Sequence, residues 1–457
     1  MKYLKIFTAV ASLAFGAAFT SNAIAGVSAE EAQQLKSTLT PLGGERAGNK
    51  EGTIPAWSGG LSKPQPGWKP GTKRPDPFAD EKPLFSVTAK NLDQYADKLS
   101  DGQKAMLRKY PTYRIDVYPT HRTAAAPQYV YDNTFKNATR AKIVEGPVHL
   151  MPEGAYGGPP FPIPKSGIEV VWNHLLHYQG TDTTIDAQTW MVTADGKRVM
   201  TVEGRRNIKM PYYDPNGSPE KFDGPYWMAH IVNSGPPIRA GEAIVGRVHI
   251  DDAKTQAWVY LTGQRRVRKL PNPSGDTPTP QSAGVMTFDE VQVFSQQPGL
   301  FDWKLIGKKE MIVPYNTYKL YQPTSVDPLI AGPHLNPDYV RWELHRVWIV
   351  EAELKPGKRH SAPKSRYYFD EDSWLALLGD RWDSKGQLWK TTFGLPISFQ
   401  EFPMLEHALY GFYDLISGAW WAGPYVNKPS SQDLTAVTPP HKESIFTPDG
   451  MVGDQLR

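Results

Sequence analysis

The fold of this chain is most constrained by a succession of short segments in which apolar and polar residues alternate. Alternation with a period of two places one set of side chains on each face of a β-strand. The segments comprise residues 184–193, 197–208, 243–250, 256–267, 303–313, 341–353, 364–369 and 388–393. An open sheet of this many strands tends to curl or close. We therefore expect a mainly β fold with one large curved antiparallel sheet or half-open barrel.

Two tight turns are predicted between neighbouring segments. Asp195-Gly196 favours a two-residue hairpin turn, and residues 383–386 favour a second hairpin. If Asp195 and Gly196 form the turn, Trp190 faces Thr201 and Val192 faces Val199. Both faces of this hairpin carry apolar side chains, so we expect the sheet to be covered on both sides.

One helix is marked ahead of the first hairpin. Ser166 and Glu169 have the spacing of a capping box, and an apolar stripe runs from there to Gly180. His174 and His177 lie three residues apart on this helix, a spacing that could place two imidazoles on one metal ion. Because no third ligand is near in sequence and His177 lies off the apolar stripe, we interpret it as solvated and expect no metal.

The N-terminus has the pattern of a secretory signal peptide. Lys2 and Lys5 precede an apolar run, and Ala23-Ile24-Ala25 supplies a cleavage pattern of small residues. No later stretch is apolar and long enough to span a bilayer, so no stable membrane insertion is expected. The predicted organisation is a signal peptide (1–25), a Pro/Gly-rich extended arm with a short helix (26–110), an antiparallel β domain (111–421) and an extended C-terminal tail (422–457).

Charge and cysteine content exclude several classes of protein. The 457 residues include 51 Lys and Arg against 47 Asp and Glu, too even a balance to hold a nucleic acid by counterion release. The chain has no cysteine, which excludes disulfides, thiolate nucleophiles, cysteine-ligated metals and a lipid anchor on cysteine. These properties predict a periplasmic protein that is not lipid-anchored.

Sequence motifs for catalysis are weak. The glycine-rich nucleotide loops, the nucleophile elbow and the zinc helix motif are absent, so no cofactor or catalytic residue is assigned. Asp370, Glu371 and Asp372 form the best carboxylate cluster and, with His345, could serve a hydrolase of glycans or esters. Three consecutive acids point in different directions, however, so a solvated turn is the favoured interpretation.

Apolar residues on the predicted strands are candidates for the wall of a ligand cavity, although each could equally belong to an ordinary core. Arg265 and Arg266 follow one of these strands and could anchor an anionic head group. The candidates for the cavity are Trp190, Val192, Trp258, Tyr260, Trp342, Leu344, Trp348 and Val350.

Several motifs resemble a secreted proteobacterial family of unassigned function, domain-of-unknown-function family 1329. They include 40–49 (TPLGGERAGN), 118–122 (YPTHR), 161–165 (FPIPK), 263–268 (GQRRVR), 343–348 (ELHRVW) and 370–374 (DEDSW). That family is described as similar to the outer-membrane lipoprotein-sorting proteins LolA and LolB. The resemblance implies a half-open barrel whose concave side is capped by a few helices and takes acyl chains. It also implies association with an outer-membrane protein and an RND-type exporter.

Together these observations predict a non-enzymatic periplasmic carrier or chaperone for a lipid-like or lipoprotein-borne molecule. Two alternatives remain open at this stage. One is the hydrolase described above, and the other is a structural or interaction protein whose aromatic residues all belong to the core.

Overall fold

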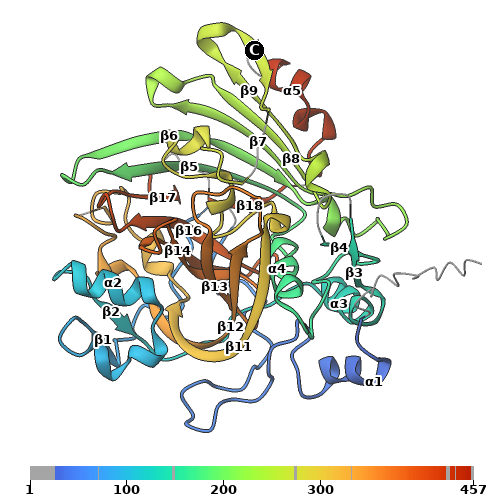
Figure 1. The fold of residues 1–457 in the computed structure, drawn as a ribbon, viewed down its shortest axis with the longest axis vertical. Coiled ribbons are helices and arrows are strands. Elements are labelled where there is room, and N and C mark those ends of the chain that lie inside the picture. Colours follow the sequence, from blue (N-terminus) through green and yellow to red (C-terminus); the bar gives the residue numbers. More distant parts are fainter. Residues whose placement is uncertain are drawn as a thin grey trace, which may run out of the picture.

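The computed structural model describes residues 26–69, 72–146, 150–271, 275–330, 332–428, 433–437 and 439–453; the predicted signal peptide lies outside them. Within these residues, sixteen strands form one sheet, and β3 (Lys142–Glu145) pairs with β4 (Leu150–Glu153) as a separate hairpin. The fold is mainly β, as predicted, and the large sheet curves strongly (Figure 1).

The large sheet consists of two antiparallel runs that meet where β17 pairs with β5. The first run contains β5 (Asp182–Val192), β6 (Arg198–Lys209), β7 (Pro225–Gly235), β8 (Ala243–His249), β9 (Gln256–Leu261) and β10 (Arg266–Lys269). The second contains β12 (Trp342–Leu354), β13 (Lys364–Asp370), β14 (Ala376–Trp382), β15 (Leu388–Phe399), β16 (Met404–Asp414) and β17 (Trp420–Tyr425), with β11 (Phe301–Pro314) paired along β12. Three short strands, β1 (Phe85–Val87), β2 (Ile115–Val117) and β18 (Thr435–Ala436), complete it.

The first predicted hairpin forms, but its register near the turn was wrong by one residue. Trp190 pairs with Met200 and Val192 with Arg198. The turn is longer than the expected Asp-Gly pair, because it spans residues 193–197 with a hydrogen bond between its ends. A bulge just before Trp190 absorbs the difference, so the predicted register holds in the rest of the hairpin.

Other strands differ from the prediction for physical reasons. The segment 256–267, predicted as one strand, folds as β9 and β10, and the turn between them places Arg265 in the left-handed region with φ 49°. Within the two long runs, four strands were not predicted, namely β7, β14, β16 and β17. Their side chains are mostly buried on both faces, so the alternation that marks a half-exposed strand is missing.

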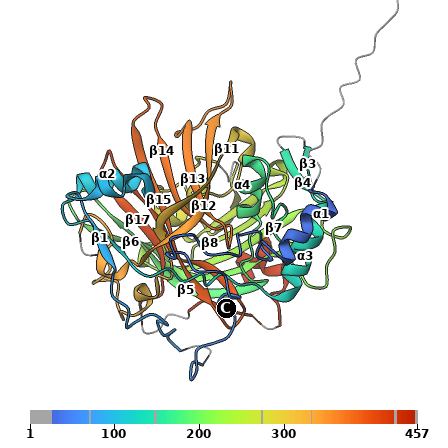
Figure 2. The same ribbon diagram turned by 90° about the horizontal axis from the view of Figure 1, so that it is seen from below.

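Helices cover both faces of the sheet (Figure 2). The predicted helix is α4 (Gly167–Leu175), where the Glu169 carboxylate accepts a hydrogen bond from the Ser166 N–H at 3.2 Å. It packs on β11 and β12, whereas α2 (Asp101–Lys109) packs on β14 and β15. The remaining helices are α1 (Ala29–Ala32) and α3 (Gln128–Arg140), which contact each other, and α5 (Pro448–Gly453), which packs on β8 and β9.

The large sheet extends beyond the expected β domain at both ends. β1 lies within the expected arm, while β18, α5 and the end of β17 lie within the expected tail. The expected boundaries after residues 110 and 421 therefore do not coincide with the limits of the sheet.

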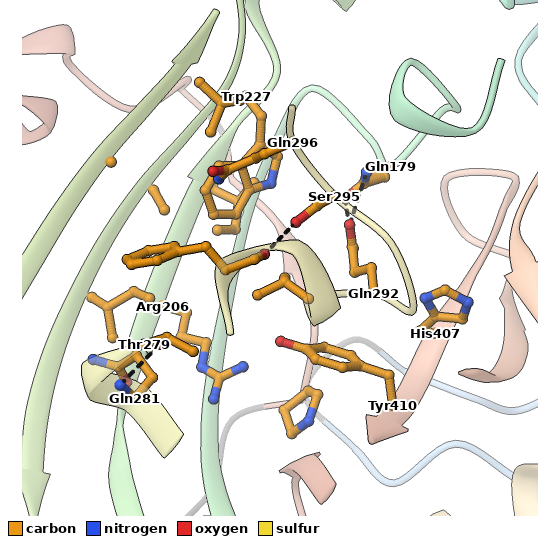
Figure 3. A pocket seen from close by; sticks show the side chains of 18 of the residues that line it. Gln179, Arg206, Trp227, Thr279, Gln281, Gln292, Ser295, Gln296, His407 and Tyr410 are labelled. Atoms are coloured by element: carbon orange, nitrogen blue, oxygen red, sulfur yellow. Dashed lines mark hydrogen bonds between the residues drawn. The ribbon is translucent and has the colours of Figure 1, made fainter. Parts of the chain in front are cut away.

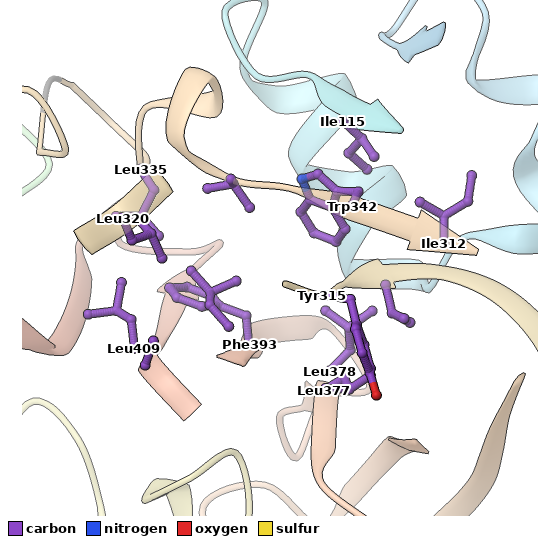
Figure 4. Close-up of a cluster of buried hydrophobic side chains, with 14 of the residues drawn as sticks. Ile115, Ile312, Tyr315, Leu320, Leu335, Trp342, Leu377, Leu378, Phe393 and Leu409 are labelled. Carbon is purple, nitrogen blue, oxygen red and sulfur yellow. The ribbon is translucent and has the colours of Figure 1, made fainter. Parts of the chain in front are cut away.

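Two large hydrophobic clusters occupy the faces of the second run of strands. One contains Trp342, Phe393 and Leu409 and is packed beneath α2 (Figure 4). The other contains Val350, with Trp348 at its edge, and includes the apolar face of α4. β12 therefore contributes its two ends to different clusters.

Candidate functional site

An apolar cavity of about 190 Å³ lies between the strands β5 to β9 and a loop-rich segment, residues 279–296, which we call the cover (Figure 3). Helix α4 borders it through Leu175. An engineered apolar cavity of about 150 Å³ is large enough to hold benzene. The walls are formed mainly by aliphatic and aromatic side chains, among them Ile185, Ile208, Ile231, Ile244, Phe288 and Phe294.

A second recess, of about 210 Å³, lies near Trp389 and Phe412. It exposes much less apolar surface than the cavity beneath the cover. The cavity beneath the cover is therefore the better candidate for an apolar ligand.

Strand alternation places one arginine in the wall of the cavity. Arg206 on β6 is directly paired with Ile185 on β5 and with Ile231 on β7, and all three side chains line the cavity. The neighbouring residues point to the opposite face, where Arg205 Nε donates to Asp186 Oδ1 at 2.7 Å. Two consecutive arginines thus differ in that one is ion-paired on the outside and the other faces an apolar interior.

The guanidinium of Arg206 has an unusual environment. It and the hydroxyl of Tyr410 on β16 extend toward one another (Figure 3). Burial lowers the pKa of Arg206, although the Tyr410 hydroxyl opposes that effect. The Arg206 side chain is half-buried and lines the cavity. Within the part of the chain that the structure describes, no carboxylate forms an ion pair with it.

A polar network occupies another part of the cavity wall. The Glu406 carboxylate contacts His177 Nε2 at 3.0 Å and accepts a hydrogen bond from Gln292 at 3.3 Å. Burial would raise the pKa of Glu406, but the neighbouring His177 outweighs that effect and lowers it. Burial lowers the pKa of His407 to about 4.

The interpretation of His177 as a solvated residue was wrong. Its side chain is buried against Glu406, because the second run of strands packs over this end of α4. His174 is also buried, and its ring nitrogens contact the carbonyl oxygens of Phe294 and Trp374. Both imidazole rings therefore already contact other groups of the protein through their nitrogens.

Buried ion pairs anchor the cover to the second run of strands. Asp289 contacts Arg381 at 2.5 Å, and Glu290 contacts Lys390 at 2.9 Å. The backbone of the cover and its flanks is strained, since several non-glycine residues have positive φ angles. These residues are Ala283, Gln292, Val293, Gln296 and Gln297.

The carboxylate cluster after β13 is buried, so the interpretation as a solvated turn was wrong. Asp372 accepts two hydrogen bonds from Arg122, at 2.6 and 2.7 Å. Glu371 accepts one from Lys308 at 2.8 Å. These cations, which come from distant parts of the chain, compensate the buried negative charge.

The same cluster includes the histidine of the hydrolase alternative. Ligand atoms of His345, Asp370 and Asp372 lie within 4.8 Å of one another. His345 Nε2 contacts Glu343 at 3.0 Å, and Arg122 binds both oxygens of Asp372. Burial and the nearby Asp372 raise the pKa of Asp370 to about 6. This arrangement resembles a charge-balanced structural network more than an open metal or catalytic centre.

The candidate cavity residues lie outside the wall of the cavity beneath the cover. Trp190 and Val192 pack at or in the cluster beneath α2, as do Trp342 and Leu344, while Trp348 and Val350 belong to the cluster around α4. Trp258 and Tyr260 are on β9, beside the cavity, but on the face that packs against Met451 of α5.

Both candidate anchors are exposed: Arg265 lies in the turn between β9 and β10, and Arg266 is the first residue of β10. Sequence reasoning did not select Arg206. The sequence does contain a pattern that could have identified Arg206. It lies two residues before Ile208 on a predicted strand, so alternation places this charged residue on the same face as an apolar one.

Known structures show partial similarity to this fold. A domain from Vibrio parahaemolyticus, described as that of an outer membrane lipoprotein-sorting protein, is 13% identical with a TM-score of 0.43, covering 63% of this chain and 98% of its own. A DUF1329 family protein from Desulfovibrio piger is 15% identical with a TM-score of 0.41, covering 60% and 92%. The LolA superfamily protein NE2245 from Nitrosomonas europaea is 10% identical with a TM-score of 0.38, covering 63% and 100%.

Sequence comparison gives a clearer assignment. The uncharacterized protein PA3922 from Pseudomonas aeruginosa is 39% identical over 431 residues, which cover 92% of this chain and 93% of that protein. The family model described as protein of unknown function (DUF1329) matches residues 86–452. The family inferred from the motifs is therefore confirmed, and this chain belongs to the DUF1329 family.

Proposed function

We propose that this protein is a carrier for a hydrophobic, lipid-like molecule, bound in the cavity beneath the cover. The observation that carries the proposal is the cavity itself, which has apolar walls on the sheet side and on the cover side. Burial of apolar surface contributes roughly 25 cal/mol per Å², so an acyl chain placed there would gain several kcal/mol. No chemical step is required of the carrier, and we propose that it is not an enzyme.

We further propose that the carrier acts in the periplasm, together with an outer-membrane protein and an RND-type exporter. The signal-peptide pattern and the absence of cysteine support a protein that is exported without a lipid anchor. Among the helices that the structure describes, none combines the length and apolar character needed to cross a membrane.

The cavity can be filled by one substitution. Gly246 on β8 lines it, has an ordinary backbone conformation, and a Cβ added there would come no closer than 3.7 Å to Trp227. Gly246→Phe should therefore fold, occupy part of the cavity and weaken binding of a neutral fluorescent apolar probe at least about tenfold, since the probe loses buried area. Native mass spectrometry of the protein from its own host should show a co-purifying lipid that the variant lacks.

Gly263→Phe is the matched control, because a Cβ at this exposed position meets open space. It should bind the probe like the wild type. The proposal is wrong if the wild type neither carries a lipid nor binds the probe, or if both variants bind as the wild type does. Either result would favour a protein whose apolar interior serves stability alone.

A further inference from the structure

We propose that the ligand is an amphiphile with an anionic head group, and that Arg206 binds this head group inside the cavity. This inference rests on the proposed carrier function and specifies the class of ligand. The chemistry is that of a carboxylate or phosphate ester at the end of an acyl chain.

The first argument is the missing counter-charge. Arginine stays protonated in proteins, and a buried charge is costly unless another charge or several hydrogen bonds compensate it. None of the described residues forms an ion pair with the Arg206 guanidinium, and the Tyr410 hydroxyl beside it compensates only part of the charge. Other buried arginines of this protein do have carboxylate partners, as Arg122 has Asp372 and Arg381 has Asp289.

The second argument is the position of the guanidinium. Arg206 lies between Ile185 and Ile231 on the cavity side of the sheet, where a side chain needed only for stability would normally be apolar. Its planar group offers several N–H donors in a geometry that fits a carboxylate or phosphate. The adjacent Arg205, which faces outward, already has such a partner in Asp186.

The third argument concerns the orientation of the ligand. Glu406 also lines the cavity, and its lowered pKa keeps the carboxylate ionised at neutral pH. Glu406 already has His177 as its partner at 3.0 Å, whereas no described carboxylate is paired with Arg206, so an anionic head group is attracted to Arg206. The acyl chain would then lie along the isoleucines and phenylalanines of the sheet and the cover, where no charge has to be desolvated.

The test compares ligands with the same chain and different heads. Dodecanoate, dodecyl phosphate and dodecanol are titrated into the delipidated protein, with displacement of the neutral probe as the measurement. At least one of the two anions should bind about tenfold more tightly than dodecanol, as hydrogen bonds to a charged group typically provide. This comparison uses the wild-type protein and does not depend on any variant.

Arg206→Gln should reduce the ratio of the anion affinity to the dodecanol affinity to about one, with little change in the affinity for dodecanol itself. Arg205→Gln is the matched control and should keep the preference, because its side chain lies on the opposite face. The relative affinities of dodecanoate and dodecyl phosphate identify the head group. Circular dichroism and the retained binding of dodecanol show that the variants are folded.

Three results would contradict the inference in distinguishable ways. Equal binding of all three compounds by the wild type overturns the role of Arg206 and leaves the carrier function intact. A preference for anions that persists in Arg206→Gln places the head group elsewhere. If none of the three compounds and no neutral probe binds, the proposed carrier function itself is wrong.

Discussion

Arg205 and Arg206 show how strongly one position along a strand changes the chemistry of a side chain. Arg205 is exposed and ion-paired, whereas Arg206 faces the cavity. Period-two alternation predicts that the two point in opposite directions. Which of the two directions leads to the interior depends on the position of the cover, and the cover begins more than seventy residues later in the sequence.

Buried histidine should make the protein sensitive to acid. The pKa of His407 falls to about 4 on folding, because burial disfavours its charged form. Between about pH 6.5 and pH 4 the unfolded chain binds a proton there that the folded protein does not, so the free energy of unfolding decreases as the pH falls. The contribution of His407 to this loss should be about 3 kcal/mol. It is measured as the difference between the wild type and His407→Gln in urea unfolding at several pH values, because Asp370 and Asp380, whose pKa burial raises to about 6, have the opposite effect in the same range.

His407→Gln should make this pH dependence shallower, since the substituted side chain does not titrate. Glu406, beside it, has a lowered pKa and should stay ionised through most of the same range. An unchanged slope in the variant would assign the acid sensitivity to other groups.

A second prediction concerns the buried arginine of the carboxylate cluster. Arg122 binds both Asp372 and the carbonyl oxygen of Glu45, and so connects the N-terminal arm to the sheet. Arg122→Gln should lower the free energy of unfolding by about 3 to 5 kcal/mol, because Asp372 stays buried without its partner. The double variant with Asp372→Asn should recover part of this loss, and additive losses would exclude a direct coupling.

At the scale of elements, the cover combines strained backbone with buried anchors. Asp289 contacts both Arg381 and His360. Asp289→Asn should weaken these contacts and allow the cover to open locally. Hydrogen exchange should then increase within residues 279–296, while β13 and β14 keep the protection of the wild type. Uniformly faster exchange would instead indicate loss of global stability.

Some helices and strands could be predicted from the sequence and others could not. Helix α4 and most half-exposed strands follow from capping residues and alternation. β14 and β16 were missed because burial on both faces removes the alternation. The hairpin register was wrong near its turn because a bulge, which depends on the local turn geometry, inserts one extra residue.

At the scale of the whole molecule, pairing of β17 with β5 turns two runs of strands into one sheet. This pairing joins segments more than two hundred residues apart, and nothing in the local pattern of either strand specifies it. The mainly β class was predictable from the sequence, but the cavity was not. Its walls combine the first run of strands with the cover, α4 and β16, which only the folded molecule brings together.

The free edge of the sheet has a consequence for how the protein behaves at high concentration. β10 ends the sheet within the described residues, and an edge strand offers unpaired N–H and C=O groups to which another chain can add. Three of its four residues, Arg266, Arg268 and Lys269, are exposed and basic. A second copy pairing in this way would bring like charges together. The basic turn thus protects an open sheet from edge-to-edge aggregation, a protection that a closed barrel would not need.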